Sequence, residues 1–306
     1  MLGPSLETLI GGLMTGVLYS LVALGFVLIF KASGVFNFAQ GAMVLFAALS
    51  VARLSEKMPL WAAILLAVVI MIVLAMVIER LVLRPLVNQE GVALLMATLG
   101  VTYFLDGFGQ TIWGSDIYSI ELGIAREPVM ILDNVFQGGI LINRDDVAAA
   151  IVAVLLVALL ALFFQKTATG RALRAVADDH QAAQAVGIPL NRIWVIVWSV
   201  AGIVAIVAGV IWGGKLGVQF SISQVALKAL PVVILGGFTS VPGAILGGLI
   251  IGVGEKMAEV FLGPPLVKMF DLAGGGIENW FAYMLALLFL LVRPEGLFGE
   301  RHIDRV

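Results

Sequence analysis

The chain has 306 residues, of which 61% are apolar and only 12% are charged, and its formal net charge is −2. Soluble domains carry roughly 25% charged residues, so this composition, with a mean hydropathy of +1.09, excludes a water-soluble globular protein. The weak negative charge gives no basic surface for nucleic acid, and we expect no such partner. The lack of cysteine excludes disulfides and thiolate metal sites.

Six stretches without a charged side chain predict membrane-spanning helices. A helix needs about 20 apolar residues to cross a hydrocarbon core of about 30 Å, and the alternation typical of barrel strands is weak here. We expect an all-α fold, a polytopic transmembrane helical bundle of about eight to nine crossings including broken or re-entrant segments, in one membrane domain over residues 1–306. The charge-free stretches are residues 8–30, 58–78, 147–165, 193–214, 229–254 and 279–292.

Residues 34–41, Gly-Val-Phe-Asn-Phe-Ala-Gln-Gly, interrupt the apolar pattern of the amino-terminal half. Amides that face lipid cost several kcal/mol, which favours Asn37 and Gln40 lining a path through the bilayer. The other interpretation is a loop followed by small residues that let helices approach closely, and for the glycines we favour close packing.

Two carboxylates belong to the next apolar segments, 58–79 and 91–113. Ionisable residues inside a membrane are functional candidates by default. Asp106 lies in the outer third of its helix, where lining a vestibule and reaching the headgroups are equally good interpretations. Glu79 ends its helix and can reach the membrane interface, so it needs no function.

The loops differ in charge, which sets the expected orientation. Segment 114–146 carries six carboxylates and two arginines and suits the outer side. The turn near 80–90, the loop 166–192 and the carboxyl-terminal tail carry Lys and Arg and suit the cytoplasm. Counting the crossings backwards from these loops places the amino terminus outside.

The loop 166–192 predicts a short, alanine-rich helix. Arg171 and Arg174 lie one turn apart, and Gly187 followed by Pro189 predicts the end of the helix. Such a helix either tethers two spans or serves as a rigid handle for another protein. Small residues on one side suggest a face shaped to enter a partner's groove. They are Ala182, Ala183 and Gly187.

Residues 209–216, Gly-Val-Ile-Trp-Gly-Gly-Lys-Leu, nearly match the phosphate-binding Walker A loop. Leu216 replaces the hydroxyl residue that would hold Mg²⁺, and the run ends a membrane helix, so we expect no ATPase site in this chain. Asp179 and His180 have no further ligand at a helical offset, and we expect solvated surface there rather than a metal site. Catalysis has no candidate residues.

A second interruption, at residues 215–240, predicts a broken or re-entrant element. Interrupted segments in corresponding halves of a transporter indicate a substrate path near the bilayer midplane. Lys228 precedes this element and Glu255 ends the helix after it, and a structural ion pair is the favoured interpretation. The interrupting residues are Gly217, Pro231, Gly236 and Gly237.

The loop 166–192 carries a motif that is found in a known protein family. Gln181-Ala-Ala-x-x-x-Gly187 resembles the EAA loop of ABC importer permeases, with Gln in place of Glu and without the later Ile-x-Leu-Pro part at the usual spacing. The whole chain resembles the permease subunit of high-affinity branched-chain amino acid importers (LivH type). Further matching elements follow the chain in order: Gly16-Val-Leu-Tyr19, Asn37-Phe-Ala-Gln-Gly41, Gly170-Arg-Ala-Leu-Arg174, Leu235-Gly-Gly-Phe-Thr-Ser-Val-Pro-Gly243 and Pro294-Glu-Gly-Leu297.

The resemblance implies a multi-subunit importer in the bacterial inner membrane. This chain would pair with a homologous second permease subunit, two cytoplasmic ATP-binding subunits that hold ATP and Mg²⁺, and a periplasmic substrate-binding protein. It implies no cofactor, metal or catalytic residue in this chain. Branched-chain or other hydrophobic amino acids are the expected cargo. Amides, urea and aromatic acids are alternative cargoes, and an ion-coupled secondary transporter is the alternative class.

Two groups of functional residues are therefore expected. The translocation pathway comprises Tyr19, Asn37, Phe38, Gln40, Gly41, Thr98, Thr102 and Pro231. Coupling to the ATPase involves Gly170, Arg171, Arg174, Gln181, Ala182, Ala183 and Gly187.

Overall fold

The structure is a computed structural model that describes residues 2–34, 36–86, 89, 91–124, 128–131, 139–178, 180–271 and 276–299. The chain forms two compact units, each assembled from segments that are far apart in the sequence. The first unit comprises Met1–Ala23, Gly123–Leu155 and Lys228–Val306, and the second comprises Leu24–Leu122 and Leu156–Leu227. Helices α1 (Leu2–Ser33) and α5 (Arg144–Lys166) contribute to both units.

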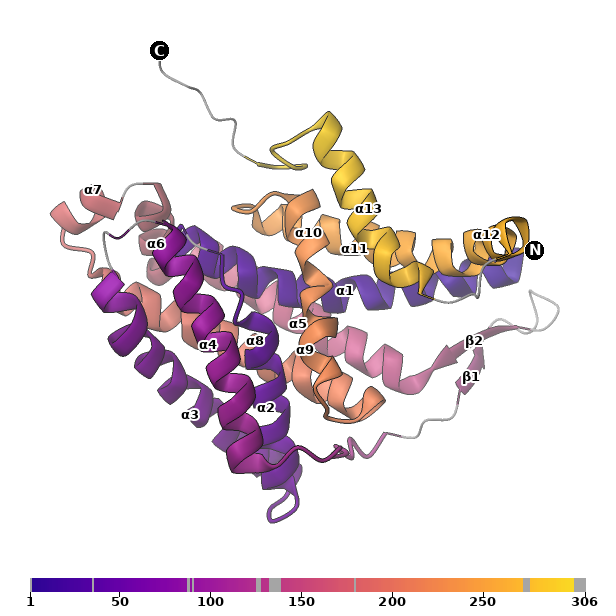
Figure 1. Cartoon of the computed structure of the whole chain (residues 1–306), viewed down its shortest axis with the longest axis horizontal. Helices are drawn as coiled ribbons and strands as arrows, with labels where there is room; N and C mark the ends of the chain where they lie inside the picture. Colours follow the sequence, from indigo (N-terminus) through magenta and orange to yellow (C-terminus); the bar gives the residue numbers. More distant parts are fainter. Residues whose placement is uncertain are drawn as a thin grey trace. The chain divides into compact units, whose positions relative to one another are not determined.

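Helix α2 (Gln40–Ser55) is the centre of the second unit (Figure 1). Every residue from 40 to 52 is buried, because α2 contacts α3, α4, α8 and α9 of the same unit. The other elements wholly within this unit are α3 (Leu60–Ile78), the π-helix η1 (Glu79–Leu83), the 3₁₀ helix η2 (Arg84–Leu86), α4 (Gly91–Trp113), α6 (Ala168–Asp178), α7 (His180–Ala185), α8 (Leu190–Leu216) and α9 (Ser221–Leu227).

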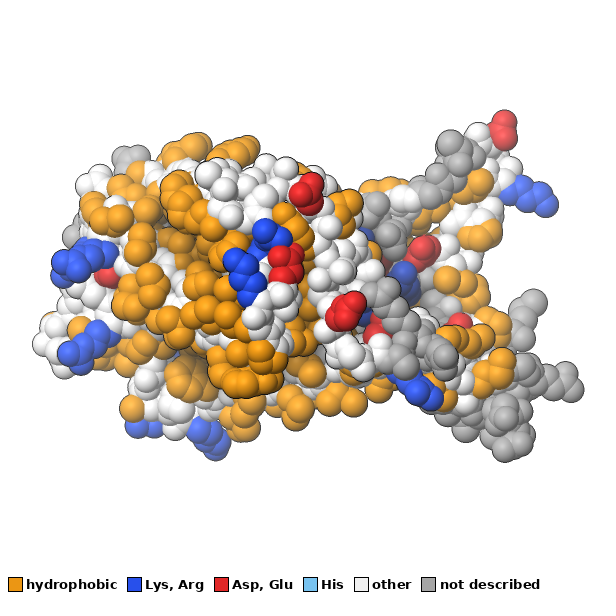
Figure 2. All heavy atoms as spheres, turned by 90° about the horizontal axis from the view of Figure 1, so that it is seen from below, with side chains coloured by type: hydrophobic (Ala, Val, Ile, Leu, Met, Phe, Trp, Pro, Cys, Tyr) orange, Lys and Arg blue, Asp and Glu red, His pale blue; other side chains and the backbone are white. Residues whose placement is uncertain are grey.

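Helix α3 shows why these segments are helices of a membrane protein. One stripe at four-residue spacing, Ala63, Ala67, Met71 and Ala75, is fully buried, since residues four apart lie on one helix face and small side chains let helices approach closely. The opposite face is equally apolar but exposed. A helix that is hydrophobic all round needs a bilayer or a large core, and hydrophobic side chains cover much of the face shown in Figure 2.

The first unit contains a β-hairpin and a bent helical segment. Strands β1 (Pro128–Ile131) and β2 (Ile140–Asn143) pair antiparallel with Pro128 opposite Asn143. The hairpin lies in the segment that the sequence assigns to the outer side, and it leaves the fold essentially all-α. The other elements wholly within this unit are α10 (Ala229–Gly236), α11 (Val241–Met257), the π-helix η3 (Ala258–Leu262), α12 (Gly263–Phe270) and α13 (Ile277–Val292).

Helices α1 and α11 meet through a glycine seam within the first unit. A Cβ atom on Gly12 would lie 2.8 Å from the Cα of Val253, and one on Gly16 would lie 2.6 Å from the carbonyl oxygen of Gly248. One turn further, the hydroxyl of Ser20 donates to the carbonyl oxygen of Ile245 at 3.0 Å. Small residues at four-residue spacing thus bring the two backbones into direct contact.

The predicted apolar segments are confirmed as helices. Five helices of the described residues are long and apolar enough to cross a membrane, or six if one bent pair counts as a span. Two shorter apolar helices, Gln40–Ser55 and Trp280–Val292, accompany them. The chain is a multi-pass membrane protein, and the crossing number of eight to nine stays a prediction.

The predicted break in 215–240 is confirmed at two glycines. Helix α8 ends at Gly217, with a φ of 76°, and α10 ends at Gly237, with a φ of 99° that L residues rarely adopt. The helical pieces on either side of the second break meet at 117°, so residues 229–254 do not form one straight helix. Pro231 was expected to interrupt the element as well. Helix α9 (Ser221–Leu227) ends and α10 (Ala229–Gly236) begins on either side of Lys228, because Pro231 has no N–H for the carbonyl oxygen of Leu227 four residues earlier.

Some charges used for the orientation lie outside the described residues, so the structure does not test them. They are Arg126, Glu127, Asp133, Arg301 and Arg305, and the same holds for Asp179 of the Asp179–His180 pair.

Candidate functional site

The buried amides at the start of α2 hold the second unit together. Asn37 and Gln40 are both fully buried. Asn37 Oδ1 accepts from the N–H of Ala39 at 3.1 Å, which begins α2, and Asn37 Nδ2 donates to Gln40 Oε1 at 3.3 Å. Gln40 Nε2 donates to the carbonyl oxygen of Ala201 in α8 at 3.4 Å. The amides that the sequence assigns to a pathway therefore also bond to each other and to the backbone of this unit.

Other predicted pathway residues surround these amides in the same unit. Thr98 is 2% exposed, and its hydroxyl donates to the carbonyl oxygens of Phe36 and Leu95. Thr102 donates to the carbonyl oxygen of Thr98 one turn away. Phe38 contacts the ring of Phe36 edge-on, with centroids 5.0 Å apart. Residues 36–40 and α4 thus form one polar and aromatic cluster.

Gly41 is a contact position, as favoured for the glycines. A Cβ atom there would lie 2.6 Å from the carbonyl oxygen of Ser223, so α2 and α9 approach each other at the backbone. A Cβ atom on Gly25 of α1 would lie 2.9 Å from Nε2 of the Gln40 side chain. Any larger side chain at these positions would separate the helices.

A buried ion pair with a tyrosine lies in the first unit. Lys228 Nζ lies 3.0 Å from Glu255 Oε1, and the Tyr19 hydroxyl donates to the same oxygen at 3.3 Å. Glu255 is 1% exposed and Tyr19 is 3% exposed. The structural ion pair expected for Lys228 and Glu255 is confirmed, whereas the participation of Tyr19 could not be read from the sequence. Pro231, also assigned to the pathway, is buried in this unit.

The coupling loop folds into two short helices, α6 and α7, instead of one. Its end is as predicted: Gly187 has a φ of 86°, and the N–H of Ile188 bonds back to the carbonyl oxygen of Ala183 at 3.0 Å. Pro189 then precedes α8. This turn fixes the direction in which α7 projects from α8.

Three of the residues predicted for coupling, Gly170, Arg171 and Arg174, stabilise the turn between α5 and α6. A Cβ atom on Gly170 would overlap the backbone of Phe164. Arg174 donates from Nη1 to the carbonyl oxygen of Phe164, and Arg171 donates from Nη1 to that of Lys166 at 3.4 Å. These guanidinium groups satisfy carbonyls that the end of α5 leaves without intrahelical donors.

The rest of the coupling set presents the outward surface of α7. Gln181, Ala182 and Gly187 are exposed, whereas Ala183 is 2% exposed and anchors the helix. Val186, which the sequence reasoning missed, exposes 77% of its surface.

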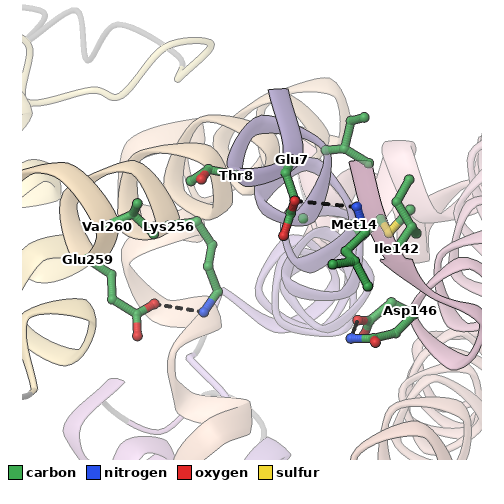
Figure 3. A pocket seen from close by; sticks show the side chains of 12 residues that line it. Glu7, Thr8, Met14, Ile142, Asp146, Lys256, Glu259 and Val260 are labelled. Carbon is green, nitrogen blue, oxygen red and sulfur yellow. Dashed lines mark hydrogen bonds and ion pairs between the residues drawn. The ribbon is translucent and has the colours of Figure 1, made fainter. Parts of the chain in front are cut away.

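An acidic cavity of about 410 Å³ lies in the first unit (Figure 3). Its lining includes the carboxylates of Glu7, Asp146 and Glu259 and the single ammonium of Lys256. Glu7 accepts from the N–H of Leu141 on β2 at 3.3 Å, and Lys256 donates to Glu259 at 2.8 Å. The sequence signal for this cavity was weak, because its charges come from the ends of three separate apolar segments.

Three further candidates have defined positions. Residues 209–216 are helical and belong to α8 up to its end, with a Cβ on Gly209 at 2.7 Å from the carbonyl oxygen of Val44, so they do not form a phosphate-binding loop. Asp106 is half-buried in α4, and its Oδ1 has no hydrogen-bond partner among the described residues. Glu79 is only 6% exposed in η1, and its position at the membrane interface stays a prediction.

The family model and the similar proteins point to the same family. The family described as branched-chain amino acid transport system / permease component matches residues 8–293. The high-affinity branched-chain amino acid transport system permease protein BraD of Pseudomonas aeruginosa is 28% identical over 98% of this chain and 98% of its own length. LivH of Escherichia coli K12, a protein of the same description, is 28% identical over 98% of this chain and 97% of its own length. A probable LivH of Methanocaldococcus jannaschii is 29% identical over 94% of this chain and 91% of its own length.

A match over nearly the whole chain covers both units, the α2 amide cluster, the Lys228–Glu255 pair and the α6–α7 loop together. The chain belongs to the permease component family of branched-chain amino acid transport systems.

Proposed function

We propose that this chain is the membrane subunit of a binding-protein-dependent ABC importer for branched-chain amino acids. The observation that carries the proposal is the family match over residues 8–293, together with relatives of that description matched over nearly their full length. A homologous second permease, two ATP-binding subunits and a periplasmic binding protein would complete the importer in a bacterial inner membrane. Under this proposal the chain itself carries out no hydrolysis.

The α6–α7 loop is the proposed contact with the ATP-binding subunits. The exposed residues Ala182, Val186 and Gly187 form the contacting face, while Gly170 and Arg174 fix the loop to the end of α5. A displacement of α7 would therefore be passed to α5 and, through the Gly187 turn, to α8. ATP binding would act on transport only by favouring one conformation of these helices over another.

The orientation follows from the same proposal. The loop 166–192 and the Arg-bearing end of α3 would face the cytoplasm, and the amino terminus, the β-hairpin and the acidic cavity would face outside. The acidic cavity would then receive basic side chains of the binding protein. Asn37, Gln40, Thr98 and their neighbours would act on the path chiefly by setting the position of α2.

The coupling contact can be tested by transport in vesicles that contain the co-expressed complex. Ala182→Arg places a long cation on the exposed face of α7 without straining the backbone, whereas Gly187→Arg would also strain a residue with a φ of 86°. Ala168→Arg, at the exposed start of α6, is the matched control. We expect uptake of labelled leucine to require ATP and binding protein, to be lost in Ala182→Arg, and to persist in Ala168→Arg. Equal uptake by both variants would contradict the assignment of α7.

The cargo is tested in the same vesicles by competition. Excess isoleucine and valine should suppress leucine uptake, and urea, a short amide and an aromatic acid should not. Suppression by one of the latter group instead would assign the importer to that solute class.

One observation favours a second candidate function, an ion-coupled secondary transporter. The half-buried carboxylate of Asp106 has an oxygen without a hydrogen-bond partner among the described residues, and intramembrane carboxylates serve proton coupling. In that case uptake would follow a proton gradient without ATP, and Asp106→Asn would abolish it. Under the importer proposal Asp106→Asn leaves ATP-driven uptake unchanged.

A further inference from the structure

A basic cavity of about 430 Å³ lies between the end of α3 and the start of α8, within the second unit. Its size is within the roughly 300–1,000 Å³ of small-ligand sites. Three arginines, one glutamate and one asparagine supply its polar lining, and three apolar side chains complete it. The lining residues are Met76, Glu79, Arg80, Arg84, Asn191, Arg192, Val195 and Ile196.

The charges of this cavity are not neutralised by the protein. Arg80, Arg84 and Arg192 are exposed, and none of them forms an ion pair within the part of the chain that the structure describes. Guanidinium groups bind phosphate through charge-assisted, often bidentate hydrogen bonds. The lining, with a formal charge of +2, therefore suits a phosphate group.

Glu79 adds an independent observation. Its side chain is more than nine-tenths buried, yet its Oε1 has no hydrogen-bond partner among the described residues. A buried acceptor without a donor destabilises the folded protein. Glu79 lines the cavity, and a small rotation of its side chain would bring the carboxylate to a hydroxyl group of a bound molecule, which would supply the missing donor. The cavity thus calls for a ligand with both a phosphate and a hydroxyl.

The depth of the cavity indicates where that ligand comes from. Glu79 is the twentieth residue of the span Leu60–Leu86, and at 1.5 Å per residue it lies about 28 Å along the helix, close to the thickness of a hydrocarbon core of about 30 Å. Arg192 lies in the first turn of the span Leu190–Leu216. Met76, Val195 and Ile196 lie on the membrane side of the charges. The charged residues at headgroup level suit the polar headgroup of a phospholipid, and the apolar residues next to them suit its acyl chains.

We propose that this cavity binds the headgroup of a hydroxyl-bearing anionic phospholipid, of the phosphatidylglycerol type. The phosphate accepts from Arg80, Arg84 and Arg192, a headgroup hydroxyl donates to Glu79, and the acyl chains follow the apolar wall. Basic pockets between membrane helices bind anionic lipids by the same chemistry. The site is independent of which solute the protein carries.

The complex is isolated from nanodiscs that contain equal amounts of phosphatidylglycerol and phosphatidylcholine. Native mass spectrometry then measures which lipid the complex retains. We expect preferential retention of phosphatidylglycerol, weakened roughly fivefold for each of Arg80→Gln, Arg84→Gln and Arg192→Gln. Arg293→Gln, which removes an exposed arginine at the end of α13, is the matched control and should retain lipid like the wild type. Because the three arginines make no ion pair in the described structure, their variants should fold.

Two further arms separate the sources of phosphate and the role of Glu79. Millimolar inorganic phosphate should not displace the lipid, since it lacks the acyl chains. In nanodiscs with equal amounts of phosphatidylglycerol and phosphatidic acid, which has no headgroup hydroxyl, the wild type should retain more phosphatidylglycerol. Glu79→Leu should remove that preference. Equal retention of phosphatidylglycerol and phosphatidylcholine, or unchanged retention in all three arginine variants, would overturn the proposal. Loss of the lipid on assembly with the ATP-binding subunits would overturn it as well and assign the cavity to that interface.

Discussion

The ammonium group of Lys228 lies 3.0 Å from Oε1 of Glu255, so an ion pair with a 2% exposed carboxylate links the start of α10 to α11. Removing one partner of a buried pair leaves an uncompensated charge and costs about 3–5 kcal/mol. Since Lys228 is partly exposed, we expect Lys228→Met to lower the free energy of unfolding by about 3 kcal/mol. The double variant Lys228→Met/Glu255→Met should regain at least part of that loss. Unfolding in mixed micelles, followed by tryptophan fluorescence, measures both, and a wild-type midpoint for Lys228→Met would contradict the expectation.

The Tyr19 hydroxyl shares Oε1 of Glu255 with Lys228. We expect Tyr19→Phe to destabilise the protein by about 1 kcal/mol, the net contribution of one hydrogen bond, while leucine uptake at saturating substrate stays near wild type. If Tyr19 instead contacts the cargo, the same variant would keep its stability and change the concentration of leucine at half-maximal uptake. The two measurements on one variant decide between structural and pathway roles.

The contact of α2 with α8 depends on Gly209. A Cβ there would lie 2.7 Å from the carbonyl oxygen of Val44, a buried backbone atom that cannot rotate away. We expect Gly209→Ala to cost about 1–3 kcal/mol. Gly100→Ala, on the exposed face of α4 with open space around it, is the matched control and should stabilise by up to about 1 kcal/mol, because alanine is the better helix former. Similar losses of unfolding free energy in both variants would show that the effect comes from helix propensity and not from the close approach of α2 and α8.

The amide of Asn37 both starts α2 and bonds to Gln40. Asn37→Leu leaves the Ala39 N–H without its acceptor, and we expect a loss of about 2 kcal/mol in unfolding free energy. Asn143→Leu on β2 removes one exposed hydrogen bond, from Nδ2 to Asp146 Oδ2 at 3.1 Å, and should cost no more than about 1 kcal/mol. A stable Asn37→Leu protein with altered cargo preference would assign Asn37 to the path rather than to the core.

If the acidic cavity receives basic side chains of a binding protein, charge should control the association rate. We expect Glu7→Gln/Glu259→Gln to slow association several-fold at low ionic strength and to weaken its dependence on salt. Glu56→Gln, which alters an exposed carboxylate paired with Arg53 in the other unit, is the control. Surface plasmon resonance with the permease complex in nanodiscs gives both rates, and an unchanged salt dependence would argue against this contact.

Hydrophobic length was sufficient to predict most of the fold. The predicted apolar segment 91–113 coincides with α4, and the charge-free stretch 279–292 falls within α13, because apolar runs bounded by glycine or charged residues leave little choice of boundary. The bend between α10 and α11 was harder to place, since the apolar pattern continues through residues 229–254. Gly236 and Gly237 predicted an interruption, and the φ of Gly237 and the Ser240 cap on the Gly243 N–H show that the chain bends there.

Tertiary contacts limited what the sequence could say about the candidate site. A buried amide and a path-lining amide look alike in a sequence, and only the distances from Asn37 and Gln40 to their partners reveal a role in packing. Arg171 and Arg174 had a similar ambiguity, because their bonds to the end of α5 depend on a turn at Gly170. The burial of Glu79 could not be predicted either, because it depends on the π-helical turn η1 that follows α3.

The glycine seam between α1 and α11 determines which movements are available to the first unit. Side chains at an ordinary helix contact can change rotamer and let one helix slide past the other, but at Gly12, Gly16 and Gly248 only backbone atoms meet. We therefore expect α1 and α11 to translate or tilt together as one rigid body. Under the importer proposal, a rearrangement between α10 and α11 would then be accommodated at the turn after α10, where Gly237 already adopts a φ of 99°.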